Sequence, residues 1–128
     1  MEENKMNLPT NLKYTKSHEW VKDLGNGLYE IGLSDFAQKE LGEIVYVNLP
    51  QEGDELIAGK SFADVESVKA VSDIFSPLNG IVKEVNEKLL SSPESINKEP
   101  YEAWLIRAEG VFGEELFSAE EYEKVCSS

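Results

Sequence analysis

The chain has 128 residues, of which 41% are hydrophobic and 29% are charged, a balance typical of a folded globular protein. Its 25 acidic and 12 basic residues give a net charge of −13 at neutral pH, which repels nucleic acid and anionic membrane surfaces, so we expect neither as a partner. With one cysteine and one histidine, the chain can form no internal disulfide and has too few ligands of these types for an ordinary transition-metal centre.

The N-terminal region is predicted to contain a loose polar arm followed by a hairpin. The arm covers residues 1–10, which have neither an apolar signal core nor an arginine-rich amphipathic pattern. The two strands of the hairpin fall within residues 13–23 and 28–34, and the second strand alternates with the period of two that a strand requires. The Gly-Asn-Gly sequence at residues 25–27 is typical of the tight turn between them.

A short helix and several short strands are expected next. The helix covers residues 34–42, where Ser34 can cap its start and Gly42 can end it. Glycine, proline and asparagine then divide the chain into apolar segments, which we expect to form strands over residues 43–50, 60–67, 70–76, 80–86 and 102–109. Many short strands with little helix favour a β-sandwich or a small barrel. We expect residues 1–128 to form a single domain, because this length suffices for one core.

Two more helical segments are predicted in the C-terminal half. The first lies within residues 91–97, where a serine can cap the helix and Pro93 can occupy its first position. The second covers about residues 118–126 and begins with a capping box formed by Ser118 and Glu121. Both segments are short, so they add little helix to a mainly β fold.

The segment VESVKAVSD places Lys69 in the middle of an apolar run, where a lysine is not expected to be buried. Gly59 lies ten residues before this lysine and Gly80 lies eleven residues after it, with strand-like sequence in both intervals. This spacing predicts a hairpin with Lys69 at its tip, in solvent, and with Val65 and Val71 packed inward on the two arms. A coincidence of spacing is the alternative.

The motifs of the common catalytic centres are absent from the sequence. A nucleophile that needs a histidine base would have to use His18, which stands between Ser17 and Glu19. Neighbours on an extended strand point to opposite faces, so this tripeptide predicts no triad. We interpret His18 as a half-buried residue of a strand, and Trp20 and Trp104 as core or partly buried aromatic residues.

Lys69 is therefore the residue with the most distinctive chemistry. A lysine reacts either as an amine of lowered pKa or as the attachment point for another group. The acidic neighbours Glu66 and Asp73 favour the charged ammonium form, which is a poor nucleophile. An exposed hairpin tip suits attachment by a modifying enzyme, and an ordinary turn lysine remains the alternative on these grounds.

Six segments of the chain, in this order, resemble the signature segments of the glycine cleavage system H protein family. They are YTKSHEWV, DFAQKELGEIVYVNLP, GDEL, VESVKAVSDIFSPLNG, VNEKL and INKEPY. The resemblance extends from about Tyr14 to Trp104, and the acidic segment EEYEKVC is similar to the C-terminal end of the family. Six ordered segments at the family's spacing are highly specific.

The resemblance implies both a fold and an attached group. The fold would be the flattened antiparallel β-barrel, or hybrid sandwich, of the lipoyl-carrier type, with short helices and a C-terminal helix. Lys69 matches the family's modified lysine and would carry lipoic acid in amide linkage to its side-chain nitrogen. The motif that lipoate-attaching enzymes recognise around it would comprise Glu66, Ser67, Val68 and Ala70.

The resemblance also implies a carrier rather than an enzyme, with no catalytic residue. The lipoyl arm would accept the aminomethyl group of glycine at the P protein, a pyridoxal-phosphate glycine decarboxylase. The T protein, an aminomethyltransferase, would pass the one-carbon unit to tetrahydrofolate. The L protein, a dihydrolipoamide dehydrogenase, would then reoxidise the arm.

In the family, the loaded arm folds back into a cleft on the protein surface. The positions that match this cleft are Ser17, Glu19, Asp73 and Glu40. Carboxylates such as Glu19 and Asp73 would shield a cationic aminomethyl group while the cleft excludes water. The chain departs from the family at Pro100–Trp104, which is shorter and lacks the usual glycine, so the contact of this loop with the arm is open.

Several alternative functions are left open by the sequence. A carrier for lipoate relay or storage, or a lipoyl carrier of another pathway, would have nearly the same sequence. A biotin carrier is disfavoured, because methionines flank the lysine in that class and Val68 and Ala70 flank it here. A stand-alone enzyme would keep its activity in Lys69→Ala, and a structural module would carry no modification. We expect a cytoplasmic protein if the source is bacterial, or a mitochondrial matrix protein if the chain is a processed eukaryotic form.

Overall fold

The computed structural model describes residues 6–127, so residues 1–5 of the predicted N-terminal arm lie outside the described part, as does Ser128. The described end of the arm has no regular structure, but Asn7 is tied to the body, since its N–H donates to Asp35 and its carbonyl accepts from the Tyr101 hydroxyl. The strands are β1 (Lys13–Tyr14), β2 (Glu19–Gly25), β3 (Leu28–Leu33), β4 (Ile44–Asn48), β5 (Glu55–Leu56), β6 (Ser61–Ser67), β7 (Val71–Phe75), β8 (Leu78–Val85) and β9 (Ile106–Phe112). The helices are α1 (Asp35–Leu41), α2 (Lys88–Ser91), α3 (Ser95–Lys98) and α4 (Ala119–Ser127).

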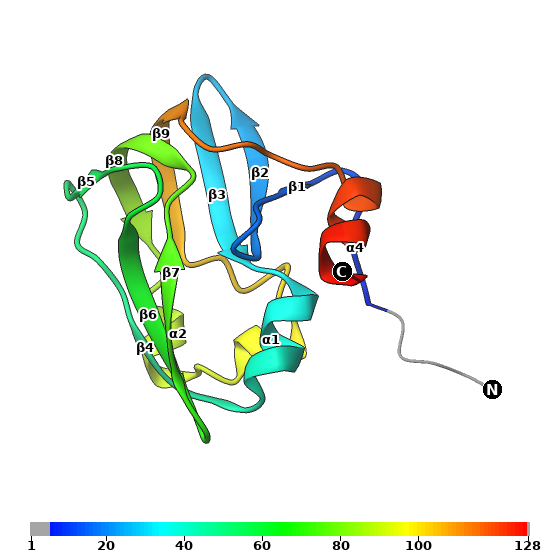
Figure 1. The fold of residues 1–128 in the computed structure, drawn as a ribbon. Coiled ribbons are helices and arrows are strands. Elements are labelled where there is room, and N and C mark those ends of the chain that lie inside the picture. The colour runs from blue at the N-terminus through cyan, green and yellow to red at the C-terminus, as the bar shows by residue number, and fades with distance from the viewer. Residues whose placement is uncertain (1–5, 128) are drawn as a thin grey trace.

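The strands form two antiparallel sheets that pack across one core (Figure 1). One sheet has six strands in the order β1-β2-β3-β9-β8-β5, and the other has three strands in the order β4-β6-β7. Both sheets and α1 contribute buried apolar residues to the core, among them Ile31, Ala37, Val47, Val65, Ile74 and Ile106. The predicted mainly β fold is confirmed, and it takes the form of a barrel-like sandwich in which the two sheets stay separate.

A second, smaller core lies between α4 and the β1–β2 end of the large sheet (Figure 1). The Tyr122 ring of α4 stacks on the Tyr14 ring of β1, with centroids 4.8 Å apart and planes 7° apart. The predicted capping box starts this helix, because Glu121 accepts from the Ser118 backbone N–H while the Ser118 hydroxyl accepts from the Glu121 N–H. The helix therefore presents Tyr122 to the sheet from a fixed start.

The predicted N-terminal hairpin and the helix that follows it are confirmed. Strands β2 and β3 pair through a two-residue turn in which Asn26 and Gly27 both have positive φ, the geometry that matches the twist of a hairpin. Helix α1 begins where the Ser34 hydroxyl accepts from the Ala37 N–H, and it ends at Gly42, whose φ is 81°.

Other elements differ from the predictions at their ends. Strand β5 and helix α2 were not predicted, because two- and four-residue elements have no recognisable period. Helix α3 begins at Ser95 rather than at Pro93, since the Pro93 carbonyl accepts from the Ile96 N–H in a preceding turn. Strand β9 begins later than predicted, because a turn closed by the Ala103 N–H on the Glu99 carbonyl precedes it.

Candidate functional site

Lys69 lies in the two-residue turn of the β6–β7 hairpin, which projects from the body of the molecule in Figure 1. The Ser67 N–H donates to the Ala70 carbonyl at 2.7 Å and closes the turn. The Ser67 side-chain oxygen accepts from the N–H groups of Lys69 and Ala70 at 3.2 and 3.1 Å. Ser67 is itself buried, so a fixed side chain holds a turn that presents Lys69 to solvent.

The hairpin was predicted correctly, but the inward position of Val71 was wrong. Val65 is fully buried, whereas Val71 is 67% exposed. The turn contains two residues and not a single central one, so Val65 pairs with Ser72, and Val71 pairs with Glu66. Adjacent residues on a strand face opposite ways, so Val71 lies on the outer face with Glu66. The observed register thus differs by one residue from the predicted one, and it exposes Val71 near the lysine.

The two glycines used to place the hairpin have different roles. Gly59 has a φ of 85° and lies in the turn before β6, as a turn glycine should. Gly80 lies inside β8 and pairs with Gly110 of β9. A Cβ added at Gly80 would stand 2.0 Å from the Glu109 carbonyl oxygen, so this position needs glycine for close strand approach.

The lysine turn is also tied to the body. The Val68 N–H donates to the Glu43 carbonyl at 3.1 Å, in the connection between α1 and β4. The Lys69 side chain passes near Gly42, because its Cε would lie 3.7 Å from a Cβ built there. The motif residues therefore differ in accessibility: Lys69, Val68 and Ala70 are exposed, Glu66 is partly exposed, and Ser67 is covered.

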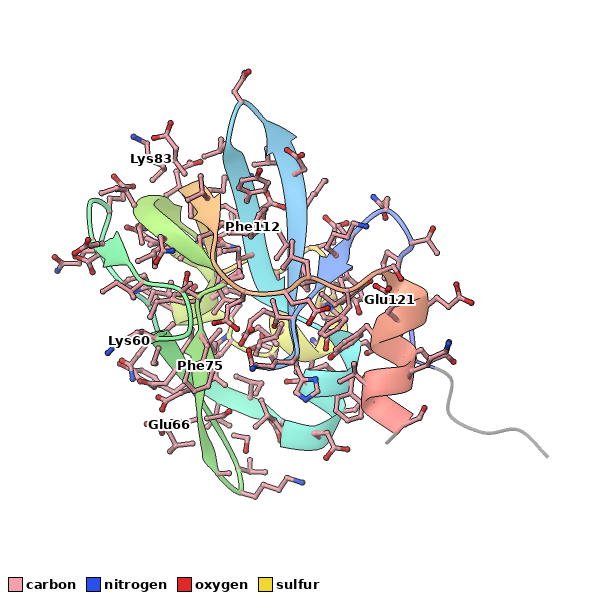
Figure 2. The ribbon with its side chains drawn as sticks, turned by 45° about the horizontal axis from the view of Figure 1, so that its top comes forward. Lys60, Glu66, Phe75, Lys83, Phe112 and Glu121 are labelled. Carbon is pink, nitrogen blue, oxygen red and sulfur yellow. The ribbon has the colours of Figure 1, made fainter. Side chains whose placement is uncertain are left out.

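A cavity of about 280 Å³ lies between the turn that joins β1 to β2 and the end of β7. Its lining includes Thr15, Lys16, Ser17, Glu19, Phe75 and Glu114. Phe75 stands at the body end of β7 and Glu66 stands nearer the tip of the hairpin (Figure 2). From Val71 to Phe75 the strand rises about 13 Å, so a group on Lys69 must follow this edge of the sheet to reach the cavity.

Glu19 is a deeply buried acidic residue of this cavity, with 1% of its surface exposed. Its carboxylate accepts from the hydroxyls of Thr15 and Ser17 at 2.5 and 2.6 Å. It also accepts from the Phe75 N–H at 3.1 Å, which links the two sheets. Burial raises the pKa of Glu19 above its ordinary value, and these hydrogen bonds oppose the rise.

The structure brings together only part of the predicted cleft. Ser17 and Glu19 share the cavity, whereas its lining includes neither Asp73 nor Glu40. Asp73 is exposed on β7 between the lysine turn and Phe75, along the path from the tip. Glu40 is exposed on α1, where its charge partly opposes the lowering of the His18 pKa that burial causes.

Thr15 and Glu114 are among the lining residues that the sequence reasoning missed. Thr15 carries no motif, although its position four residues before Glu19 allows both its hydroxyl and its backbone to contact that residue. Glu114 follows β9 and had been treated as one of many uninformative carboxylates. Glu114 lies beside the cavity because the segment that follows β9 passes next to Gly59.

His18 does not lie in a strand, contrary to the prediction. It is half-buried in the turn between β1 and β2, and its φ of 80° is unusual for a residue other than glycine. This backbone turns the His18 ring away from the cavity toward Tyr122, while Ser17 and Glu19 face the cavity. The three residues therefore form no triad, as predicted. Their side chains are separated by the turn at His18, and not by the alternation of side chains along a strand.

The loop at Pro100–Trp104 lies away from the cavity. The fully buried Trp20 donates from Nε1 to the Pro100 carbonyl at 2.9 Å, and the Tyr101 ring lies beside it. Trp104 is partly buried, with the Arg107 guanidinium 4.1 Å from the centre of its ring. The short loop therefore packs against the core and contributes nothing to the described lining of the cavity.

Among residues 6–127, no three side chains of the metal-binding types lie close enough together to hold an ion. No helix in the same range has the length and apolar character needed to cross a membrane. The predicted site residues offer two places for an organic group, which are the amine of Lys69 and the cavity beside Glu19.

Comparison with known proteins gives one consistent family. The family described as "Glycine cleavage H-protein" matches residues 12–128. The glycine cleavage system H protein of Lachnoclostridium phytofermentans is 54% identical over 120 residues, covering 93% of this chain and 94% of its own. That of Halalkalibacterium halodurans is 51% identical over 125 residues, covering 94% and 97%. A crystal structure of a glycine cleavage system H protein from Mycobacterium marinum superposes with a TM-score of 0.87 at 34% identity, covering 94% and 99%.

Proposed function

This chain belongs to the glycine cleavage H-protein family, whose members carry the lipoyl arm in glycine cleavage, and from this membership we propose that Lys69 carries the arm here. The observation that supports the assignment is the presentation of Lys69 at an exposed turn held by the buried Ser67. A modifying enzyme can reach the amine without unfolding any part of the core. Glu66, Val68 and Ala70 flank the lysine on the accessible hairpin and would be read with it.

The residues present fit a lipoyl group at two places. The amine of Lys69 is free to form an amide, and the cavity beside Glu19 lies along the same edge of β7. When attached, the group supplies a dithiolane that can be reduced and can take up an aminomethyl group. The protein would supply the anchor at Lys69 and a covered carboxylate at Glu19.

The cavity suits a cationic cargo better than a neutral one. Glu19 is buried and accepts three hydrogen bonds, and the described structure shows no ion pair to it, so its negative charge is available to a positive group. Asp73, exposed on the same strand as Phe75, adds a second carboxylate along the path from the tip. Coverage by Phe75 and Pro77 would limit water at the cargo and so slow its loss.

The role that follows is that of a non-catalytic carrier. The arm would take the aminomethyl group of glycine at the P protein, yield the one-carbon unit at the T protein and be reoxidised by the L protein. Lipoate-attaching enzymes would be its other partners. The relatives named above come from bacteria, so we place the protein in the bacterial cytoplasm.

The test is the mass of the intact protein after incubation with lipoate, ATP and a lipoate ligase. We expect the mass increase of one lipoyl amide, located by peptide mapping on the peptide that contains Lys69. Lys69→Arg should remain unmodified, while Lys60→Arg, which changes an exposed lysine just before the same hairpin, should be modified like the wild type. Lipoyl attachment to another lysine, or none under conditions that modify a known lipoyl domain, would exclude the proposal.

A carrier for lipoate relay would pass this first test as well. Reconstitution with the P, T and L proteins, tetrahydrofolate and NAD⁺ separates the two functions, because only a glycine cleavage carrier supports glycine-dependent formation of methylenetetrahydrofolate. We expect turnover with the lipoylated wild type and none with Lys69→Arg. Full lipoylation without such turnover would favour the relay function.

A further inference from the structure

The Tyr122 hydroxyl connects the C-terminal helix to the turn that carries Glu19. Its oxygen lies 2.7 Å from His18 Nδ1 and 2.7 Å from Ser34 Oγ. Ser34 is the cap of α1, and His18 is the residue directly before Glu19. One hydroxyl on α4 therefore contacts both the start of α1 and the turn that bears the buried carboxylate.

The three polar groups form a chain in which the donors can be ordered. The Ser34 hydroxyl already accepts from the Ala37 N–H, and its hydrogen needs an acceptor, which Tyr122 provides. With Nδ1 unprotonated, the Tyr122 hydroxyl then donates its own hydrogen to His18 Nδ1. This order requires a neutral His18 ring, which agrees with the lowering of the His18 pKa by burial.

The backbone of His18 shows why the ring needs a partner. Its φ of 80° lies in the left-handed region, where residues other than glycine are strained. The turn is closed on both sides, because the His18 N–H donates to the Thr15 carbonyl and the His18 carbonyl accepts from the Ser34 N–H. Strained backbone of this kind persists only where the surroundings fix it. Here the surroundings are the Tyr122 hydroxyl and the Phe36 ring, 4.8 Å from the His18 ring.

We propose that His18 and Tyr122 are positioning residues, which hold the turn so that the Glu19 carboxylate stays against the Phe75 N–H in the cavity that receives the loaded arm. The inference rests on the proposed function for the role of that cavity. The C-terminal helix thereby acts on the arm site through the His18 ring, without contacting the arm. Without the Tyr122 hydroxyl, the turn is free to relax and the contact of Glu19 with Phe75 weakens.

Tyr122→Phe tests this with little change in packing, since the phenyl ring can still stack on Tyr14. Tyr101→Phe is the matched control. It also removes a partly covered phenol hydroxyl, one that accepts from the Asp35 N–H, donates to the Asn7 carbonyl and interacts with the Tyr14 hydroxyl, but in the described structure is hydrogen-bonded to neither His18 nor Tyr122. His18→Gly is the second variant, because glycine accepts the positive φ and only the ring is lost.

The first measurement is amide hydrogen exchange in the unlipoylated full chain. We expect exchange of the Phe75 N–H, which donates to Glu19, to become about fivefold faster or more in Tyr122→Phe and His18→Gly. Tyr101→Phe should match the wild type. The Val82 N–H of β8, which donates to the Asp54 carbonyl, should be unchanged in all variants. This measurement needs no lipoyl group, so it stands even if Lys69 proves not to carry one.

The second measurement is the time for which the free, lipoylated protein retains its aminomethyl group. We expect a several-fold shorter retention in Tyr122→Phe and His18→Gly, and wild-type retention in Tyr101→Phe. Unchanged Phe75 exchange in a folded Tyr122→Phe or His18→Gly protein would overturn the positioning role. Equal acceleration in Tyr101→Phe would do the same, because it would indicate general loosening. Faster exchange with normal retention would overturn the link to the arm.

Discussion

The Ser67 side chain contributes directly to the presentation of Lys69, because its oxygen is the acceptor for the N–H groups of both Lys69 and Ala70. A backbone turn would ordinarily use a carbonyl for this purpose. With a buried hydroxyl in its place, the geometry of the turn is coupled to the packing of the sheet. The serine is thus part of the attachment site, although it is not itself modified.

We expect Ser67→Ala to lower the free energy of unfolding by about 1 kcal/mol, because two N–H groups lose their acceptor. The looser turn should also reduce kcat/KM of a lipoate ligase for the protein. Ser72→Ala, on the same hairpin, removes only a weak 3.4 Å bond to the Asp73 carbonyl and is the control. Urea unfolding and lipoylation kinetics measure the two effects, and equal behaviour of both variants would contradict the role given to Ser67.

Glu19 makes the stability of the protein depend on pH in a direction opposite to that of most carboxylates. Burial raises its pKa above the ordinary value near 4.5, so the folded state keeps a proton that the unfolded chain has released. Between the two pKa values the folded state binds more protons, and the free energy of unfolding therefore falls as pH rises through that window. Above the raised pKa, the stabilisation of the neutral carboxyl is lost.

Glu19→Gln has no proton to lose, and its stability should lack this fall. We expect the difference in unfolding free energy between wild type and variant to move in favour of the variant as pH rises from about 4 to about 7, in urea titrations at each pH. Other groups that titrate, including His18, are present in both proteins, so their contributions to the difference in unfolding free energy largely cancel. A difference that is constant over this range, or that moves the other way, would show that the Glu19 pKa is not raised.

At the scale of elements, the β6–β7 hairpin shows how a turn length sets the faces of two strands. With two residues in the turn, Val65 faces the core and Val71 faces solvent. Val65→Ala should cost on the order of 2 kcal/mol of unfolding free energy, because it leaves a cavity in a closed core. Val71→Ala should stay within about 0.5 kcal/mol of the wild type. If urea unfolding showed similar losses of unfolding free energy in the two variants, Val71 would face the core, as in the register that the sequence predicted.

The same hairpin shows what the sequence could and could not predict. Turn chemistry and apolar runs were enough to predict β2–β3, α1 with its cap, and a hairpin around Lys69. The register was not predictable, because VESVKAVSD permits a turn with an odd or an even number of residues. A shift of one residue in the pairing exchanges the side chains that face the core with those that face solvent. Pairing with β4 and the bond from Val68 to Glu43, which are contacts across the fold, accompany the observed choice.

The cavity was only partly predictable for a related reason. Ser17 and Glu19 were predicted through the resemblance of their segment to a family, and the structure places both in the lining. Thr15 and Glu114 carry no motif, and they reach the cavity only because the β1–β2 turn bends and the chain returns past Gly59. The positive φ of His18 likewise has no signature in a tripeptide that fits an extended strand equally well.

At the scale of the whole molecule, the β6–β7 hairpin projects from the body (Figure 1), and the chain carries a net charge of −13. Few of the acidic groups are neutralised by neighbours in the described part. The ion pairs there include Arg107 with Glu30 and with Glu84, while the carboxylates of Asp64, Glu66 and Asp73 lie outward on the small sheet. Such a field favours fast, weak encounters with basic surfaces, as a carrier that visits several enzymes requires.

This charge predicts that encounters of the carrier with its enzymes depend on salt. We expect reoxidation of the reduced, lipoylated protein by the L protein to slow roughly tenfold in kcat/KM as ionic strength rises from about 10 to about 150 mM, because the Debye length shrinks from ~30 Å to ~8 Å. Free dihydrolipoamide is the matched substrate, since it carries the same dithiol without the large negative charge of the protein. Its reoxidation should change little over the same range. An equal salt effect on both substrates would place the dependence in the enzyme, and a faster reaction of the carrier at high salt would mean that the surface it meets is acidic.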